Sequence, residues 1–262
     1  MRIVFSDIDG TLIDCRQGMY GPSQKTIDAV AMLKRQGDLF VIVSGRPKCL
    51  LDECVLALNP DGLIMSNGSY LEYHGQKIHE ECLSPNDVLK IKKFGIEHHC
   101  PFYLETESHV YTPDLNDPLH REFFDDWTIG DALQTYDNQD LKFYMAMIAL
   151  QHDDHLLQLC EDYFNEDLVA TRQGDIYGYD INVKSASKGA GIKKFVEYLK
   201  VNDIETFALG DGQNDVSMMR AVDHPIGMNN GCDELKKEVE YITSDVGQEG
   251  FYNALKHYKI IL

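Results

Sequence analysis

Short, continuously apolar runs alternate with helical patterns through the first part of the chain. The runs at residues 3–5, 39–43 and 63–65 are contiguously hydrophobic, which is typical of strands buried on both faces. A helical pattern at residues 22–37 separates the first two, and Pro47 suits the first turn of another helix. Strand, helix, strand, helix, strand predicts an α/β fold with a parallel sheet covered on both sides.

The pattern changes near Ser84, where strands and helices become mixed and aromatic and β-branched residues more frequent. Ser84-Pro85-Asn86-Asp87 is typical of a helix start, and a second helix is expected from Asp153 or Asp154. Strand candidates lie at residues 102–104, 110–111, 141–150, 168–171 and 177–183, with a polar segment around Trp127. We therefore expect residues 84–184 to form a separate α+β unit inserted into the first domain.

The α/β pattern resumes at Ser187-Lys188-Gly189, which leads into a helix. Further strands are predicted at residues 206–209, 225–228 and 241–242, and helices at 216–221 and 251–257. The first domain is therefore expected to be discontinuous, with residues 1–83 and 185–262 building one sheet.

Composition and net charge limit the classes of function that this protein could have. The chain of 262 residues is 44% hydrophobic and 26% charged, as in ordinary globular proteins, and its net charge of −19 argues against nucleic acid and anionic membrane surfaces. Seven scattered cysteines form no C-x-x-C pair, and no run has the length of a membrane span or a signal peptide. These features predict a soluble, cytoplasmic protein, and they leave its oligomeric state open.

Two carboxylates directly follow the first strand. If the strand continues, Asp7 and Asp9 project on the same side, where they repel each other unless a cation or a shared proton intervenes. Gly10 permits a tight turn and Thr11 adds a hydroxyl, so the stretch could bind Mg²⁺ and phosphate. A simple Asp-Gly turn at the end of a strand is the alternative interpretation.

Two further polar clusters occupy equivalent places. Ser44-Gly45-Arg46 and the segment 210–215, Gly-Asp-Gly-Gln-Asn-Asp, each follow a predicted strand. In a parallel sheet these strand ends share one edge, where open α/β folds bind ligands. The segment 210–215 does not fit an EF-hand loop, and the chain has neither a Walker A nor a G-x-G-x-x-G motif.

With these motifs in order, the chain resembles the haloacid dehalogenase-like (HAD) hydrolases of the Cof-type subgroup. The resemblance covers nearly the whole chain and rests on segment 7–11 (Asp-Ile-Asp-Gly-Thr), segment 44–46, Lys188 and segment 210–215. It implies a Rossmann-like core with an α/β cap inserted between the second and third motifs, where the pattern changes.

The resemblance also implies roles for individual residues. Asp7 would be the nucleophile and Asp9 the proton donor and acceptor. The magnesium ion would be held by Asp7, the Asp9 backbone carbonyl and Asp211, with Asp215 supporting the metal or its waters. The phosphate-binding candidates are Thr11, Ser44, Gly45, Lys188 and Asn214, with Arg46 holding either phosphate or a polar group of the substrate.

We therefore expect a Mg²⁺-dependent phosphatase acting on a small phosphate ester, such as a sugar phosphate, through an aspartyl-phosphate. A phosphomutase acting on hexose phosphates and a non-catalytic phosphometabolite-binding protein are the alternatives. Substrate selection is expected in the cap. The turn at residues 172–175 is a candidate contact loop, unless it is an exposed hairpin tip.

Overall fold

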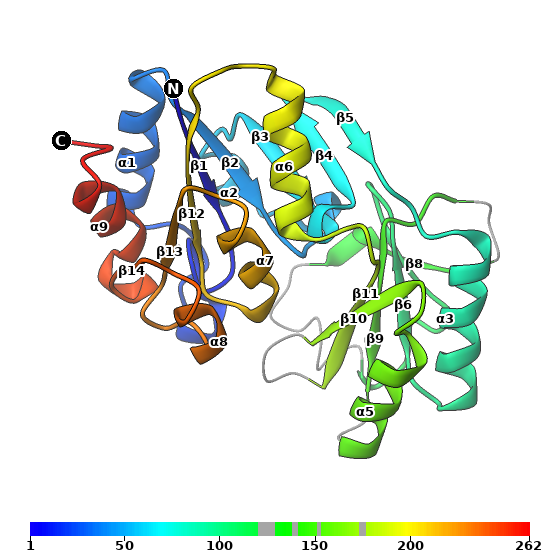
Figure 1. Cartoon of the computed structure of the whole chain (residues 1–262). Coiled ribbons are helices and arrows are strands. Elements are labelled where there is room, and N and C mark those ends of the chain that lie inside the picture. Colours follow the sequence, from blue (N-terminus) through cyan, green and yellow to red (C-terminus); the bar gives the residue numbers. More distant parts are fainter. Residues whose placement is uncertain (120–128, 138–140, 151–152, 173–176) are drawn as a thin grey trace.

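The computed structural model describes residues 1–119, 129–137, 141–150, 153–172 and 177–262. These residues form two β-sheets, each with its own helices, and the chain passes from the first sheet to the second and back (Figure 1). The predicted polar segment around Trp127 and most of the predicted contact loop, residues 173–175, lie outside the described ranges.

The first sheet has eight strands in the order β14-β13-β12-β1-β2-β3-β4-β5. Pairing is parallel from β14 to β3 and antiparallel for β4 and β5, so the predicted α/β class and parallel core sheet are confirmed. Its strands are β1 (Arg2–Ser6), β2 (Leu39–Val43), β3 (Gly62–Met65), β4 (Tyr70–Tyr73), β5 (Gln76–Glu80), β12 (Glu205–Gly210), β13 (His224–Gly227) and β14 (Tyr241–Ile242).

Helices cover both faces of this sheet, which explains the continuous apolar runs of its strands. On one face Val4 and Phe40 pack with α1 (Gln24–Arg35) and α9 (Gly250–His257). On the other face Phe5 packs with α6 (Lys188–Leu199), α7 (Val216–Met219) and α8 (Asp233–Lys236). The successive residues Ile3, Val4 and Phe5 of β1 therefore enter clusters on alternate faces, and all three are buried.

The second sheet has six strands in the order β10-β11-β9-β6-β7-β8, and only β7 and β8 pair in parallel. Its strands are β6 (Phe102–Glu105), β7 (Val110–Thr112), β8 (Leu133–Thr135), β9 (Met145–Ala149), β10 (Leu168–Arg172) and β11 (Gly178–Val183). Residues of α3 (Pro85–Glu97) and α5 (Asp154–Tyr163) form a core with one face. The mixed sheet with its helices is the predicted α+β cap.

The other face of the cap sheet meets the core. Leu50 of the core lies in one apolar cluster with Tyr103, Met147 and Ala149 of the cap. The chain enters the cap between β5 and α3 and leaves it between β11 and α6 (Figure 1). Domain boundaries at 83/84 and 184/185 fall in these two connections and stay a prediction.

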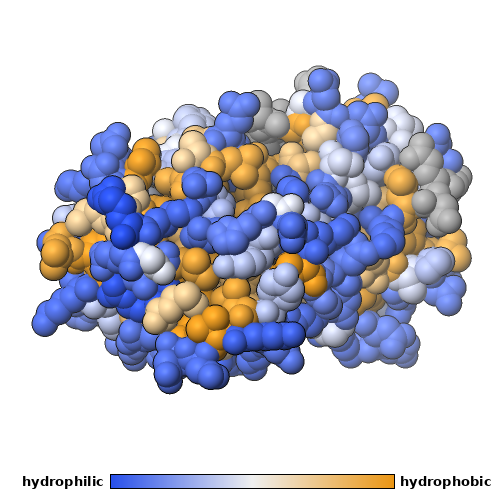
Figure 2. Space-filling model, turned by 90° about the horizontal axis from the view of Figure 1, so that it is seen from above, coloured by the Kyte–Doolittle hydropathy of each residue, from blue (hydrophilic) through white to orange (hydrophobic). Residues whose placement is uncertain are grey.

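The surface is largely polar. The face in Figure 2 is mostly hydrophilic, with separate hydrophobic patches between the polar side chains, in keeping with the acidic composition. Every helix in the described parts of the chain is too short or too polar to cross a bilayer.

Candidate active site

The carboxyl ends of β1 and β12 bring two of the predicted motifs together. The Asp7 amide donates to the Leu209 carbonyl at 3.0 Å, so the chain stays paired with β12 just beyond β1. Gly10 has a φ of +75°, and a Cβ there would lie 2.1 Å from Asp211 Oδ2. A glycine at position 10 therefore lets the first motif turn directly against the Asp211 carboxylate.

Three carboxylates gather at this edge. Asp7, Asp211 and Asp215 each offer an oxygen within 4.8 Å of the others. Burial, then the charge of Asp215, raises the pKa of Asp7 to about 7, although Lys188 opposes the shift. Burial, then the charges of Asp7 and Asp215, raises the pKa of Asp211 to about 8. A buried set of oxygen ligands whose charges repel fits a hard divalent cation, so these residues could hold a metal ion.

Lys188 neutralises part of this charge. Its side chain is 1% exposed, and Nζ donates to Asp7 Oδ1 at 2.7 Å and to Asp215 Oδ1 at 2.5 Å. Burial lowers the Lys188 pKa, but the two carboxylates raise it more, so the pKa is above its usual value and the ammonium stays charged. Lys188 is the first residue of α6, whose N-cap Ser187 accepts a hydrogen bond from the Ala190 amide. The capped start of the helix thus positions the cation.

The loop after β12 is folded around Asp215. Asp215 Oδ2 accepts hydrogen bonds from the amides of Asp211 and Gly212, each at 2.9 Å. Thr11 Oγ1 donates to Asp211 Oδ1 at 3.2 Å. The cluster is therefore held in place by the backbone of its own loop and by the first motif.

Asp9 lies apart from this cluster, in a bidentate ion pair with Arg46. Arg46 Nε donates to Asp9 Oδ2 at 2.8 Å, and Nη2 donates to Asp9 Oδ1 at 2.5 Å. The remaining nitrogen, Nη1, donates to Asp52 Oδ2 at 2.8 Å and to the Leu50 carbonyl at 3.2 Å. Arg46 is 5% exposed whereas the Asp9 side chain is 46% exposed, so a buried guanidinium orients an accessible carboxylate.

The Ser44-Gly45 turn faces Asn67, which lies in the 3₁₀ turn Ser66–Gly68 directly after β3. The Ser44 carbonyl accepts from the Asn67 amide at 3.1 Å, and Asn214 Nδ2 donates to Asn67 Oδ1 at 3.2 Å. Asn67 has a φ of +52°, in the left-handed region that asparagine tolerates. The predicted phosphate-binding residues 44, 45 and 214 therefore surround Asn67.

Asn67 also joins the core to the cap. Its Nδ2 lies 2.8 Å from Asp180 Oδ2 and 3.2 Å from Asn182 Oδ1, both on β11. A Cβ on Gly45 would lie 3.3 Å from Asp180 Oδ2, so the cap carboxylate sits directly over the turn. Sequence analysis missed Asp180 and Asn182. The available signal was two polar residues on one face of an otherwise apolar strand.

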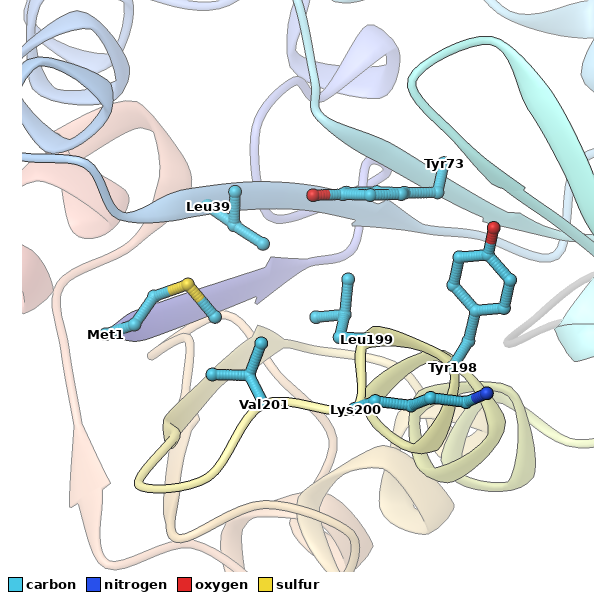
Figure 3. Close-up of a pocket in the computed structure, with 7 residues that line it drawn as sticks. All are labelled: Met1, Leu39, Tyr73, Tyr198, Leu199, Lys200 and Val201. Atoms are coloured by element: carbon cyan, nitrogen blue, oxygen red, sulfur yellow. The ribbon is translucent and has the colours of Figure 1, made fainter.

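A hollow of about 360 Å³ lies elsewhere on the core. Figure 3 shows Leu39, Tyr73 and Leu199 lining it, together with Met1, Tyr198, Lys200 and Val201. Met1 and Leu39 lie at the starts of β1 and β2, so this hollow is at the opposite edge of the sheet from the carboxylates. It contains none of the predicted site residues.

Comparison with known proteins agrees with this geometry. The family model for haloacid dehalogenase-like hydrolases matches residues 4–255. The chain belongs to this family. The HAD-like hydrolases include a Cof-type subclass, IIB, that carries an inserted cap, and this chain has that architecture. The predicted class of enzyme, a hydrolase, is therefore confirmed.

Individual relatives match this chain over nearly its whole length and over nearly the whole of their own. "Putative phosphatase YkrA" of Bacillus subtilis (strain 168) is 29% identical over 97% of this chain and 96% of its own. From the same organism, "5-amino-6-(5-phospho-D-ribitylamino)uracil phosphatase YwtE" is 23% identical over 95% of each chain. The structure of the HAD subclass IIB sugar phosphatase BT4131 has a TM-score of 0.88 at 21% identity over both whole chains, a likeness of fold alone.

Proposed function

We propose that this protein is a Mg²⁺-dependent phosphatase that hydrolyses a small phosphorylated metabolite through an aspartyl-phosphate on Asp7. The observation that carries the proposal is the buried Asp7 carboxylate, held by Lys188 beside Asp211 and Asp215 at the carboxyl edge of the sheet. A ligand-binding protein would have no need for an oriented, partly neutralised carboxylate at this position. The names of the relatives YwtE and BT4131 support an ester of a sugar or polyol.

In the first step, Asp7 attacks phosphorus and the ester P–O bond breaks. Lys188 fixes Asp7 Oδ1, so the other oxygen, Oδ2, is the one that we propose attacks. Asp9 must be protonated to give a proton to the departing alcohol, so one of its two contacts with Arg46 opens when substrate binds, and the other keeps Asp9 oriented for the transfer. In the second step, Asp9 takes a proton from water, which attacks phosphorus and releases Asp7 and inorganic phosphate.

The phosphoryl oxygens would be held by Lys188, the Ser44 hydroxyl, the Gly45 amide, Thr11 and Asn214, whose positions are fixed before substrate binds. Mg²⁺ would be bound by Asp7, Asp211 and the Asp9 carbonyl, with Asp215 in support. Its charge would reduce the repulsion between the carboxylates and the phosphate. We propose that Arg46 is a positioning residue that acts through Asp9, because its donors already bind Asp9, Asp52 and Leu50.

Phosphate release from a sugar phosphate and from 4-nitrophenyl phosphate tests the function directly. Activity should require Mg²⁺ and be lost with EDTA. Conversion of a hexose 1-phosphate into the 6-phosphate without phosphate release would instead favour the phosphomutase. Tight binding of one phosphate ester with no turnover of any would favour the binding protein.

Mg²⁺ should stabilise the fold as well as support turnover. At about a hundredfold excess over its Kd, the ion should raise Tm by roughly 5–10 °C. Because protonation of Asp7 and Asp211 competes with the metal, and burial raises both pKa values to about 7 and about 8, the apparent Kd should be weaker at pH 6 than at pH 8. Calorimetric scans at the two pH values measure both effects. An equal Mg²⁺ shift in Asp211→Asn would place the ion elsewhere.

The effect on kcat of breaking the Asp9–Arg46 pair should depend on the leaving group of the substrate. Asp9→Asn should lower kcat for a sugar phosphate by roughly 10²–10⁴-fold and kcat for 4-nitrophenyl phosphate much less, because nitrophenolate leaves without a proton. Arg46→Lys should show the same selectivity with a smaller loss, since lysine cannot make the bidentate contact. Arg220→Lys, at an exposed pair with Glu238, is the matched control. Equal losses on both substrates would contradict the proton-transfer role.

A further inference from the structure

Glu105 is a buried carboxyl whose place in the fold is not explained by packing. It ends β6, where Phe102 and Leu104 belong to the cluster under the cap helices. By alternation, Tyr103 and Glu105 lie on the opposite face, which meets the core. The residue is 6% exposed, and its Oε2 has no hydrogen-bond partner within the described part of the chain. Buried polar atoms are normally satisfied, so an unsatisfied carboxyl oxygen at this interface points to a missing partner.

A second carboxyl lies on the same face of the cap sheet. Glu105 is paired with Met145 of β9, and Asp180 of β11 is paired with Met147, so the two acids are diagonal neighbours across β9. Asp180 lies over Gly45 and binds Asn67, which in turn binds Asn214 of the catalytic loop. Cys49, which follows the Ser44–Arg46 turn, donates through its thiol to the carbonyl of Thr106, the residue after Glu105, at 4.0 Å. Both acids therefore face the predicted phosphate-binding turn from the cap side.

Building on the proposed function, we propose that Glu105 and Asp180 form the subsite for the alcohol part of the substrate, and that this alcohol is uncharged and carries several hydroxyl groups. A hydroxyl group both donates and accepts hydrogen bonds, so one ligand group can bind two acids of which one holds a proton. Burial and the nearby Asp180 raise the pKa of Glu105 well above its usual value, in keeping with a protonated Glu105 that donates. A second phosphate or a carboxylate on the alcohol would be repelled by this subsite.

The competing explanation is a neutral carboxyl that is merely tolerated in the interface. The two explanations predict different results for Glu105→Leu, which removes the hydrogen-bonding groups and fills the same place with an apolar side chain. Under both, the variant should unfold at the wild-type temperature or above it, because an unsatisfied polar group is replaced. Only the subsite explanation predicts that Glu105→Leu changes the substrate preference. Glu105→Gln keeps polarity and a donor, and it should fall between wild type and Glu105→Leu.

The experiment compares kcat/KM for sorbitol 6-phosphate, 3-phosphoglycerate, phosphoethanolamine and 4-nitrophenyl phosphate. For Glu105→Leu, the ratio of the polyol to the aryl ester should fall by roughly 10–100-fold, the range of a lost hydrogen bond in a buried site. Wild type should prefer the polyol ester to phosphoglycerate, and Glu105→Leu should narrow that preference. Asp162→Asn removes an exposed cap carboxylate on α5 and should leave all ratios unchanged.

An unchanged ratio in Glu105→Leu would overturn the subsite, and a wild-type preference for phosphoethanolamine would overturn the uncharged class of ligand. Calorimetric binding of sorbitol 6-phosphate to Asp7→Asn, with and without Glu105→Leu, needs no turnover. Weaker binding in the double variant supports the subsite even if the hydrolase mechanism fails, and equal binding contradicts it. Absence of phosphate release by wild type would contradict the proposed function alone.

Discussion

Asp7→Asn is expected to lower phosphatase activity by at least about 10⁴-fold while leaving the protein folded. The amide has the shape of the carboxylate and can still accept the hydrogen bond from Lys188, but it cannot attack phosphorus. Burial and the charge of Asp215 raise the pKa of Asp7 to about 7, so the ionised form is less favourable in the folded protein than in the unfolded chain. Removing this charge should therefore raise the metal-free Tm at pH 8, and raise it less at pH 5, where Asp7 is largely protonated in the folded protein but still ionised in the unfolded chain.

Steady-state kinetics with a sugar phosphate and thermal scans at both pH values measure these effects. Asp28→Asn, an exposed aspartate on α1, should keep wild-type activity and the wild-type Tm. Asp7→Asn with more than about a hundredth of wild-type kcat would rule out Asp7 as the nucleophile.

Lys188→Met is expected to impair both stability and activity. The ammonium group is buried between Asp7 and Asp215, and removing one partner of a buried ion pair costs about 3–5 kcal/mol. In a chain of 262 residues this corresponds to a fall in Tm of roughly 10 °C without metal. Activity should fall by at least about 10²-fold, because the variant loses the charged group that donates both to the phosphoryl group and to Asp7.

The metal gives this prediction a second readout. Mg²⁺ should raise the Tm of Lys188→Met by more than it raises the wild-type Tm, because the cation would neutralise carboxylates left without their lysine. Lys193→Met, at an exposed position on the same helix, should leave Tm and activity near wild type. A wild-type Tm for Lys188→Met in the absence of metal would show that the buried ion pair contributes little to the stability of the fold.

The core could be predicted from the sequence because its signals are local. The runs that became β1, β2 and β12 are almost entirely apolar, since helices cover both faces of the sheet, and each ends at a motif. The expected helix after Pro47 is only the 3₁₀ turn Lys48–Leu50, followed by the four-residue α2 (Glu53–Leu56). The backbone there is extended at Leu51, and the Leu50 carbonyl accepts from Arg46 instead of continuing a helix.

The parts of the site that were missed depend on how the cap meets the core. Asn67 and Asp180 are 113 residues apart, and nothing in either segment indicates their hydrogen bond. The pairing of Asp9 with Arg46 was missed for the same reason, since each residue was interpreted as a group that acts on substrate. Of the predicted contact loop, Arg172 ends β10 and lies near Tyr177, and the rest stays a prediction.

Detection of a phosphoryl group on Asp7 during turnover tests the central claim most directly. The enzyme and a sugar phosphate would be mixed with Mg²⁺ and stopped in acid within milliseconds, and the peptide containing Asp7 would be analysed by mass spectrometry. The account predicts that this peptide carries one acid-stable, base-labile phosphoryl group, formed before free phosphate and absent in Asp7→Asn. Release of phosphate from an active enzyme, with no early burst of the alcohol and no modified Asp7 peptide at any quench time, would contradict it.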